Sequence, residues 1–312
     1  KEGFPIKLVA ISNRNIKSKI NNLVVGNNEV DIELEIDFDK YNLYNDLDQM
    51  LENEDIDIVD ICLPTNLHAE ISIKAMKKGY HVFCEKPMSL TETEAKKMLE
   101  TSQEYNKKLM IGQTLRFSSP YEYIKKCIKQ KKYGEVLSAF FYRSSGVPLW
   151  CDWLIDKNKS GGVILDLHIH DVDCINWLFG KPNQLSSSEM ENKESGYNTV
   201  STNFNYDNMV INAQAGWVGE EVPFNSMFRV DFEEGSLTYQ NEQLKEVTGN
   251  GTKLINITDD NPYYKEIKHF ADLIITDKPV DIVSPDSTKE TIFILNKIKE
   301  SANKNEKVNL FN

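Results

Sequence analysis

The first third of the chain alternates short runs of β-branched residues with amphipathic segments, and this pattern constrains the fold more than any other feature. Strands that alternate with helices indicate β-α-β units, whose strands lie parallel in one sheet. Strands are expected at residues 7–12, 56–63, 81–84 and 109–113, and helices at 44–53, 67–78 and 91–106. The expected architecture of this part is a doubly wound parallel α/β sheet.

After residue 117 the pattern changes to one helix, expected at 121–130, followed by a strand-rich region. Strands at 214–218, 227–232 and 236–240, the last two joined by a turn at Glu234-Gly235, predict an open, mainly antiparallel sheet. A final helix is expected from Ser284-Pro285 to about residue 302. Because 312 residues exceed one usual core, we expect two domains, 1–116 and an α+β domain at 117–312.

Composition excludes several classes of function. The formal charge of −12 repels phosphate backbones and anionic lipids, so nucleic acid and membrane are not expected partners. No apolar run reaches the ~18 residues of a membrane span. The five cysteines are odd in number and widely spread, which indicates neither a disulfide framework nor a zinc site. With no signal-peptide pattern at the start, a soluble, cytoplasmic protein is expected.

The first candidate site is the turn after the second expected strand, with Leu63, Pro64, Thr65, Asn66 and His68. Ligands bind at the carboxyl ends of strands in open α/β sheets, so this turn is well placed for a cofactor. On spacing alone the same residues also fit an ordinary strand-to-helix turn with a capping residue.

The second candidate is Glu85-Lys86-Pro87, where a short strand ends before a helix. Ser89 is expected to cap that helix, with Glu92 returning the hydrogen bond. A lysine at this sheet edge, if desolvated, becomes a proton donor or acceptor near neutral pH. A solvated loop is the competing interpretation of so short a motif.

The third candidate runs from Gly161-Gly162 to Asp173. As a helix it places Asp166, His170 and Asp173 on one face, a spacing suited to acid-base work. As a strand it places Asp166, His168 and His170 on one face, which suits a divalent metal and a hydrolase. A capping and ion-pair network explains the spacing equally well. The flanking glycines, with Gly180 as terminator, favour a bounded helix.

Taken together, the order and spacing of these motifs resemble the glucose-fructose oxidoreductase / inositol dehydrogenase / MocA (Gfo/Idh/MocA) family. The series contains Pro-Thr-Asn-x-His, Glu-Lys-Pro, Leu115-Arg116-Phe117, Gly-Gly-x-x-x-Asp-x-x-x-His-x-x-Asp, a tryptophan-bearing strand and a Gly-Ser-Leu hairpin. The resemblance implies a Rossmann-like first domain and a dehydrogenase that transfers a hydride between NAD(P) and a sugar, inositol or related polyol.

The resemblance also implies roles for single residues. Lys86 would hydrogen-bond the reacting hydroxyl, His170 would accept its proton, and Asp166 would orient the sugar and the imidazole. His168 stands where many relatives have glycine and is expected to pack or to shape the pocket. The cofactor-binding residues implied are Ser12, Asn13, Arg14, Leu63, Pro64, Thr65, Asn66, His68, Glu85, Lys86 and Gln113.

For the substrate, Arg116, Tyr142, Trp153, Asp166 and His170 are the expected binding residues, and Tyr142, Arg143, Trp150 and Trp153 could form an aromatic wall. Sheet and interface packing is the alternative role of this group. At the end of the first strand an arginine, Arg14, stands in place of the usual ribose-binding acid and could accept a 2′-phosphate, so NADP is at least as well supported as NAD. No stoichiometric metal is expected.

The chain contains no Gly-x-Gly-x-x-Gly, and residues 1–12 match the region that follows this fingerprint in the family. We expect about 20 to 30 further N-terminal residues in the natural protein, enough for one strand, a glycine turn and a helix.

A non-catalytic family member that senses a dinucleotide or sugar is the main alternative function. An open sheet with apolar and aromatic residues on its outer face further predicts a homodimer or homotetramer.

Overall fold

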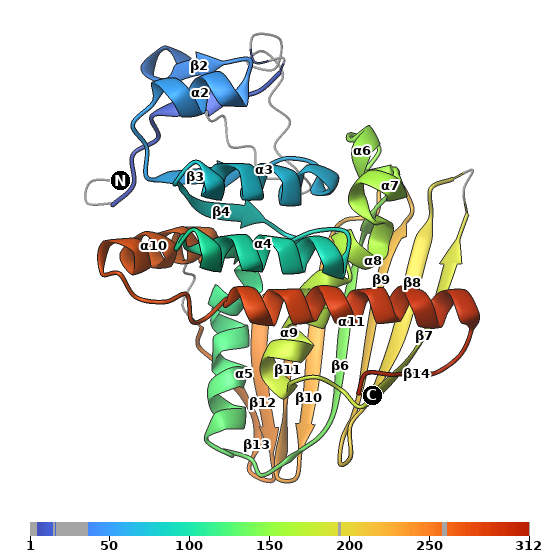
Figure 1. Cartoon of the computed structure of the whole chain (residues 1–312). Helices are drawn as coiled ribbons and strands as arrows, with labels where there is room; N and C mark the ends of the chain where they lie inside the picture. The colour runs from blue at the N-terminus through green and yellow to red at the C-terminus, as the bar shows by residue number, and fades with distance from the viewer. Residues whose placement is uncertain (1–4, 15, 17–36, 193–194, 258–260, 312) are drawn as a thin grey trace.

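The computed structural model describes residues 5–14, 16, 37–192, 195–257 and 261–311 (Figure 1). In the first part, β1 (Ala10–Ser12) pairs in parallel with β2 (Asn42–Tyr44). A second parallel sheet has the order β3-β4-β5, formed by β3 (Ile58–Ile61), β4 (His81–Glu85) and β5 (Leu109–Gly112). Parallel strands were predicted for all of these segments except β2, which lies at the edge of an expected helix. Among the described residues, no hydrogen bonds join the two sheets.

Helices connect these parallel strands, as β-α-β units require. They are the 3-10 helix η1 (Phe38–Lys40), α2 (Leu47–Asn53), α3 (Thr65–Lys77) and α4 (Glu92–Glu104). The predicted cap of α4 is wrong by two residues. Thr91 and Glu94 form the capping box, whereas Ser89 is buried and donates its hydroxyl to the carbonyl of Thr91. Burial removes Ser89 from the helix end, so the exposed threonine takes that role.

The second part is built on a nine-stranded sheet with the order β13-β12-β11-β10-β6-β9-β8-β7-β14. All its neighbouring strands run antiparallel except the central pair, β6 and β9. The strands are β6 (Val136–Gly146), β7 (Gln184–Glu191), β8 (Asn198–Asn205), β9 (Val210–Val218), β10 (Asn225–Phe232), β11 (Gly235–Gln240), β12 (Gln243–Thr248), β13 (Gly251–Ile255) and β14 (Val308–Asn309). The mainly antiparallel sheet was predicted; most of its strands were not.

Helices cover one face of this sheet (Figure 1). The remaining helices are η2 (Thr114–Phe117), α5 (Ser119–Lys129), α6 (Asp152–Ile155), α7 (Lys157–Ser160), α8 (Gly162–Asp166), α9 (Ile169–Phe179), α10 (Pro262–Ile275) and α11 (Pro285–Lys304). Ser284 caps α11 and Gly180, at φ 78°, ends α9, both as predicted. Within the described ranges, no helix combines the length and apolarity that crossing a bilayer requires.

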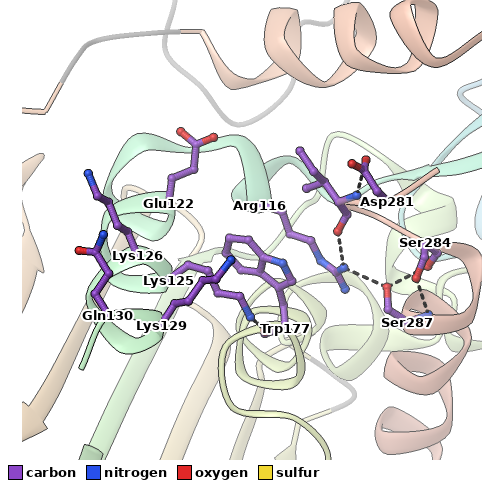
Figure 2. A pocket seen from close by; sticks show the side chains of 11 residues that line it. Arg116, Glu122, Lys125, Lys126, Lys129, Gln130, Trp177, Asp281, Ser284 and Ser287 are labelled. Carbon is purple, nitrogen blue, oxygen red and sulfur yellow. Dashed lines mark hydrogen bonds between the residues drawn. The ribbon is translucent and has the colours of Figure 1, made fainter. Parts of the chain in front are cut away.

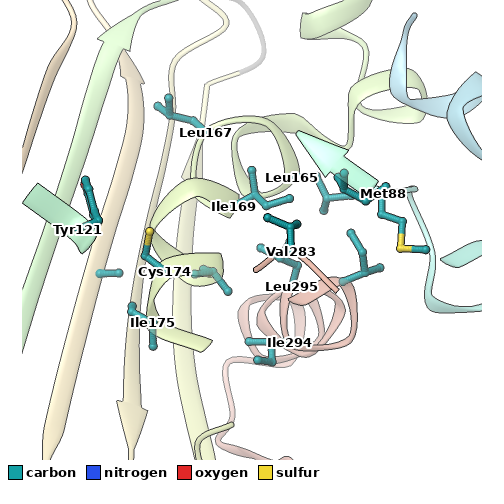
Figure 3. Packing of buried hydrophobic residues seen from close by; sticks show 14 of the residues in the cluster. Met88, Tyr121, Leu165, Leu167, Ile169, Cys174, Ile175, Val283, Ile294 and Leu295 are labelled. Atoms are coloured by element: carbon teal, nitrogen blue, oxygen red, sulfur yellow. The ribbon is translucent and has the colours of Figure 1, made fainter. Parts of the chain in front are cut away.

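A buried apolar cluster lies where α8, α9 and α11 meet the turn after β4 (Figure 3). Met88 from that turn, Leu165 from α8 and Leu295 from α11 are each 0% exposed. Burying a side chain of this size stabilises the fold by roughly 1.5–3 kcal/mol. The cluster therefore fixes the turn that carries Lys86 against the helix that carries Asp166.

Candidate active site

Lys86 is held at the carboxyl end of β4 by contacts with a single residue of the second part, Asp166. Its Nζ donates to the Asp166 carboxylate at 2.9 Å and to the Asp166 backbone carbonyl at 2.7 Å. The two side chains are 18% and 21% exposed, so the pair is shielded without being closed off. An ammonium has three protons, and these two bonds leave one for another acceptor.

A break in the helix makes this contact possible. The single helix predicted across 161–180 is wrong: α8 ends at Asp166 and α9 begins at Ile169. In an unbroken helix, the amide of His170 would donate to the carbonyl of Asp166. Here that amide donates to Leu167 instead, at 3.4 Å, and the Asp166 carbonyl accepts from Lys86. The alternative interpretation of this segment as a strand, on which the metal hydrolase depended, is also wrong.

Two buried ion pairs hold α9 in place. Asp173 binds Arg116 through both carboxylate oxygens, at 2.7 and 2.8 Å, and Asp171 binds Arg143 at 3.0 and 3.2 Å. Arg116 was expected to bind substrate, and Asp173 to share a face with Asp166 and His170. The structure instead buries Arg116 at 1% exposure against Asp173. Paired guanidinium and carboxylate groups of this geometry fix orientation as well as charge.

His170 lies in the first turn of α9. Burial, together with the positive charges of Lys86 and Arg143, holds the pKa of His170 well below its usual range. The imidazole is therefore neutral at pH 7 and able to accept a proton. Among the described residues no hydrogen bond joins Asp166 to His170, so the predicted orienting contact is absent and the carboxylate serves Lys86.

His168, two residues before His170 at the N-cap of α9, has different surroundings. It is 0% exposed, and its Nε2 lies 3.0 Å from the hydroxyl of Thr202 on β8. Burial, with the nearby charge of Arg143, lowers the pKa of His168 to about 3. The expectation that His168 packs and leaves the chemistry to His170 agrees with this placement.

The carboxyl ends of β4 and β5 carry a second group of polar side chains. The Glu85 carboxylate accepts from the amide of Lys86 at 3.2 Å and lies over Gly112, where an added Cβ would meet it at 3.4 Å. Burial raises the pKa of Glu85. Glu266, from α10, accepts from the hydroxyl of Thr114 at 2.8 Å, and burial raises the pKa of Glu266 to about 8. Its second oxygen, Oε2, is buried and has no partner within the described chain.

The predicted cofactor residues around the start of α3 differ in their exposure to a ligand. Pro64, Thr65 and Asn66 form the start of α3, whose N-terminus has no side-chain cap, and Leu63 precedes it. His68 is only 1% exposed, so its predicted contact with cofactor is replaced by a structural role. Its two ring nitrogens lie 2.7 Å from the carbonyls of Pro87 and Leu63, which joins the two candidate turns.

Gln113 is 3% exposed at the end of β5. Ser12 ends β1, and Arg14 is exposed in the turn that follows it. The residues after β3, β4 and β5 fit the nicotinamide half of a dinucleotide, since uncapped amides, the Glu85 carboxylate and the unpartnered Glu266 oxygen are available there. The described residues include no glycine-rich turn for a pyrophosphate.

Tyr142 and Trp153 were predicted to contact substrate; the structure turns Tyr142 away from α9, whereas the role of Trp153 stays a prediction. Tyr142 alternates with Arg143 along β6, so its side chain lies on the opposite face of the sheet from α9, beside Met227 and Gln214. Trp153 is half-buried on α6.

Two aromatic residues that the sequence did not single out lie near Arg143. The Phe224 ring is 5.6 Å from the Arg143 guanidinium, and the Tyr263 hydroxyl is in the electrostatic field of Arg143, Glu85 and Glu266. The sequence did contain one signal for Tyr263: the Asn-Pro pair just before it predicts a helix start, which places Tyr263 in the first turn of a helix.

With this geometry in hand, comparison with known proteins assigns the chain to a family. Residues 7–113 match the oxidoreductase family with an NAD-binding Rossmann fold, GFO/IDH/MocA, and residues 121–238 match the GFO/IDH/MocA C-terminal domain. The chain belongs to the Gfo/Idh/MocA family, and the predicted resemblance is confirmed.

Curated relatives match the chain over less than half of its length. A 2,7-anhydro-N-acetylneuraminate hydratase from Mediterraneibacter gnavus is 35% identical over 141 residues, covering 43% of this chain and 36% of the relative. A myo-inositol 2-dehydrogenase from Thermotoga maritima is 30% identical over 138 residues, covering 44% of this chain and 40% of the relative. The chain thus spans about two fifths of the length of these relatives.

Solved structures confirm the fold over nearly the whole chain. Aldose-aldose oxidoreductase from Caulobacter crescentus, complexed with glycerol, superposes with a TM-score of 0.82 at 20% identity and covers 97% of this chain and 92% of that one. Levoglucosan dehydrogenase in complex with NADH and L-sorbose gives a TM-score of 0.78 at 22% identity, covering 87% and 84%. At these identities the likeness establishes the fold.

Proposed function

We propose that the protein is an NAD(P)-dependent oxidoreductase that transfers a hydride between the nicotinamide and a hydroxyl-bearing carbon of a sugar, inositol or related polyol. The observation that carries this proposal is the Lys86 ammonium, fixed by two bonds to Asp166 with one proton left over, beside the neutral imidazole of His170. The names of relatives that act on inositols and glucosides support the substrate class.

The chemistry divides between the cofactor and the chain. When bound, the nicotinamide ring accepts the hydride that leaves the substrate carbon. Lys86 donates its remaining proton as a hydrogen bond to the substrate oxygen and stabilises the negative charge that develops there. His170 accepts the hydroxyl proton, so the alcohol becomes a carbonyl with loss of one hydride and one proton. Asp166 holds the ammonium in position through its carboxylate and its backbone carbonyl.

Aromatic and charged groups near Arg143 suit a hydroxylated ring. Phe224 and Tyr263 are 44% and 52% exposed, and an exposed ring can lie against the apolar face of a sugar or inositol. Glu85 and the imidazole of His170 offer acceptors for hydroxyl groups. Tyr142 and Arg116 are left out of this proposal, because Tyr142 lies on the sheet face opposite α9 and Arg116 is buried in an ion pair with Asp173.

The finer properties of the cofactor and of the assembly are also proposals. Exposed Arg14, after β1, favours NADP at least as much as NAD because a guanidinium can bind a 2′-phosphate.

The outer sheet face carries Phe140, Tyr142 and Met227 on its central strands. We propose that this face joins a cytoplasmic homodimer or homotetramer, with light scattering at micromolar concentration as the test.

A panel of polyols, aldoses and sugar acids, followed by NAD(P)H absorbance with both cofactors, tests the function. The proposal requires at least one member to reduce or oxidise the cofactor, and requires Lys86→Met to lower that rate by about 10² to 10⁴. A protein that binds NADH or NADPH, as seen by fluorescence, yet turns over no member of the panel would instead be the non-catalytic sensor.

A further inference from the structure

A surface cavity of about 680 Å³ opens between α5, the end of α9 and the start of α11 (Figure 2). Its lining includes none of Lys86, Asp166 and His170, so it is separate from the candidate active site. A volume of several hundred Å³ is the usual size of a small-molecule pocket.

Three lysines give the cavity its charge. Lys125 and Lys129 lie one turn apart on α5, and Lys126 adjoins them. Within the described part of the chain, none of the three forms an ion pair with a carboxylate. The protein as a whole carries a formal charge of −12, so the local positive charge of this cluster is opposite in sign to the net charge of the chain. Such a cluster attracts an anion into the cavity.

The acidic residues of the lining do not neutralise these lysines. Glu122 is bound to Lys265 at 2.7 Å, and Asp281 is bound to His269 at 2.9 Å. Glu122 is therefore already paired with a cation that does not line the cavity, and the Asp281 carboxylate is hydrogen-bonded to the His269 ring and to the amide of Ile282. The positive charge of the α5 lysines stays available to a ligand.

Lys125 shows the effect of this unbalanced charge. Burial lowers the pKa of Lys125, and the nearby cations Arg116 and Lys129 lower it further. Cations that repel one another in a partly buried site gain most from a bound anion, because the anion offsets the repulsion and the desolvation together.

Trp177 supplies a flat surface beside the lysines (Figure 2). The Lys125 ammonium lies 5.0 Å from the centroid of the Trp177 ring and also donates to the Trp177 carbonyl. The indole N–H has no hydrogen-bond partner among the described residues and remains available as a donor. An aromatic face with a free donor beside a cation favours a ligand that carries a ring.

The start of α11 forms another wall of the cavity. Ser284 caps this 20-residue helix, and Ser287 in its first turn accepts from the Arg116 guanidinium at 2.9 Å. Arg116 also binds the carbonyl of Ile282, so the wall of the cavity is rigid. The positive end of a helix dipole adds to the attraction for an anion.

We propose that this cavity binds a phosphate monoester carried on a ring, that is, a sugar phosphate or a nucleoside monophosphate. Lys125, Lys126 and Lys129 have no carboxylate partner among the described residues, and this positive charge matches a dianionic phosphoryl group better than a singly charged carboxylate. The ring would lie against Trp177.

Isothermal titration calorimetry of the whole protein tests the proposal with glucose 6-phosphate, AMP, inorganic phosphate, glucose and adenosine. At least one of the two ring phosphates should bind about tenfold more tightly than inorganic phosphate, and glucose and adenosine should bind more weakly still. Glucose 6-phosphate and AMP distinguish the two sources of the ring. Absence of binding by both, or equal binding of inorganic phosphate, would overturn the proposal.

Paired variants assign the binding to this cavity. The exposed lysines Lys126→Gln and Lys129→Gln together should weaken the ring phosphate by about tenfold or more. Lys245→Gln with Lys253→Gln, which removes the same charge from exposed positions on β12 and β13, should leave the affinity unchanged. Unchanged affinity in the Lys126→Gln/Lys129→Gln variant would place the ligand elsewhere. An equal loss of affinity in both double variants would show a response to net charge alone. Either result refutes the assignment.

Discussion

The segment that carries Asp166, Asp171 and Asp173 forms ion pairs at both of its ends, but these pairs differ in burial and in the donors that they leave free. Asp173 with Arg116 and Asp171 with Arg143 are pairs in which no side chain is more than 5% exposed, and each carboxylate receives two guanidinium bonds. Asp166 with Lys86 is about one-fifth exposed, and the ammonium keeps a proton free. Buried, saturated pairs hold α9 in position, whereas the open pair is available for chemistry.

The comparison also explains why three nearby aspartates are not interchangeable. A planar guanidinium that satisfies both carboxylate oxygens fixes an orientation and leaves nothing to bind substrate. A lysine is a point charge with three donors, so it can hold a partner and still reach a ligand. We therefore expect the open pair to control turnover and the saturated pairs to control stability.

Lys86→Met should give the largest change in rate. In a complete enzyme, turnover should fall by about 10² to 10⁴, the usual scale for losing a positioned acid-base group. Cofactor affinity, followed by NADH or NADPH fluorescence, should barely change. Lys159→Met, an exposed lysine paired with Asp156, is the matched control and should keep its rate. Wild-type turnover in Lys86→Met would remove this lysine from the mechanism.

His170→Ala should lower turnover by a similar factor, about 10² to 10⁴, because the proton acceptor is lost. Wild-type activity should persist well below pH 6.5, since the depressed pKa of His170 keeps the imidazole neutral there. His168→Ala should change the rate less. Rates measured across pH for both variants test which histidine reacts. A larger loss of rate in His168→Ala than in His170→Ala would identify His168 as the reacting imidazole.

Arg116→Met should show its effect in stability. Removing the guanidinium leaves the buried Asp173 carboxylate without a cationic partner, with only the Thr291 hydroxyl donating to it, and breaking a buried ion pair in this way costs about 3–5 kcal/mol. Urea unfolding should show this loss, and Arg229→Met, an exposed arginine paired with Asp231, should change the midpoint little. A stable Arg116→Met protein that loses only substrate affinity would restore the original prediction that Arg116 binds substrate.

The smallest predicted effect is on the pH dependence of stability. The pKa of His168 is about 3 when folded, against an ordinary value of 6.5, so the unfolded chain binds a proton that the folded chain does not. Stability is therefore lost as the pH falls below 6.5, by about 1.5 kcal/mol from this residue down to about pH 5. Urea unfolding at the two pH values should show a smaller loss in His168→Asn than in the wild type, and equal losses would contradict the assignment.

The sequence predicted the fold where local signals agree with tertiary packing. The parallel strands β1, β3, β4 and β5, the Ser284 cap and the Gly180 terminator were predicted from hydrophobic pattern and capping residues. Strands β7, β8, β12 and β13 were missed because their alternation is weak: on β7 and β8, Ser, Thr and Asn occupy both faces. The domain boundary near Phe117 stays a prediction.

The candidate site was predicted less completely than the fold. The roles of Lys86, Asp166 and His170 are implied by the family resemblance, the spacing from Asp166 selects His170 over His168, and these roles stay predictions. Helical spacing could not show that α8 ends at Asp166, because Leu167 and His168 contain no helix-breaking residue. Nor could it show that Arg116 and His68 are buried, since their partners Asp173 and Pro87 are distant in sequence.

The most direct measurement is hydride transfer itself. A substrate found in the panel, deuterated at the carbon that reacts, should transfer one deuterium to the nicotinamide, detectable by mass spectrometry of the reduced cofactor. The label should appear with the wild type and disappear with Lys86→Met at equal cofactor occupancy. Product formation with no deuterium in the cofactor would contradict the account, as would undiminished label transfer by Lys86→Met.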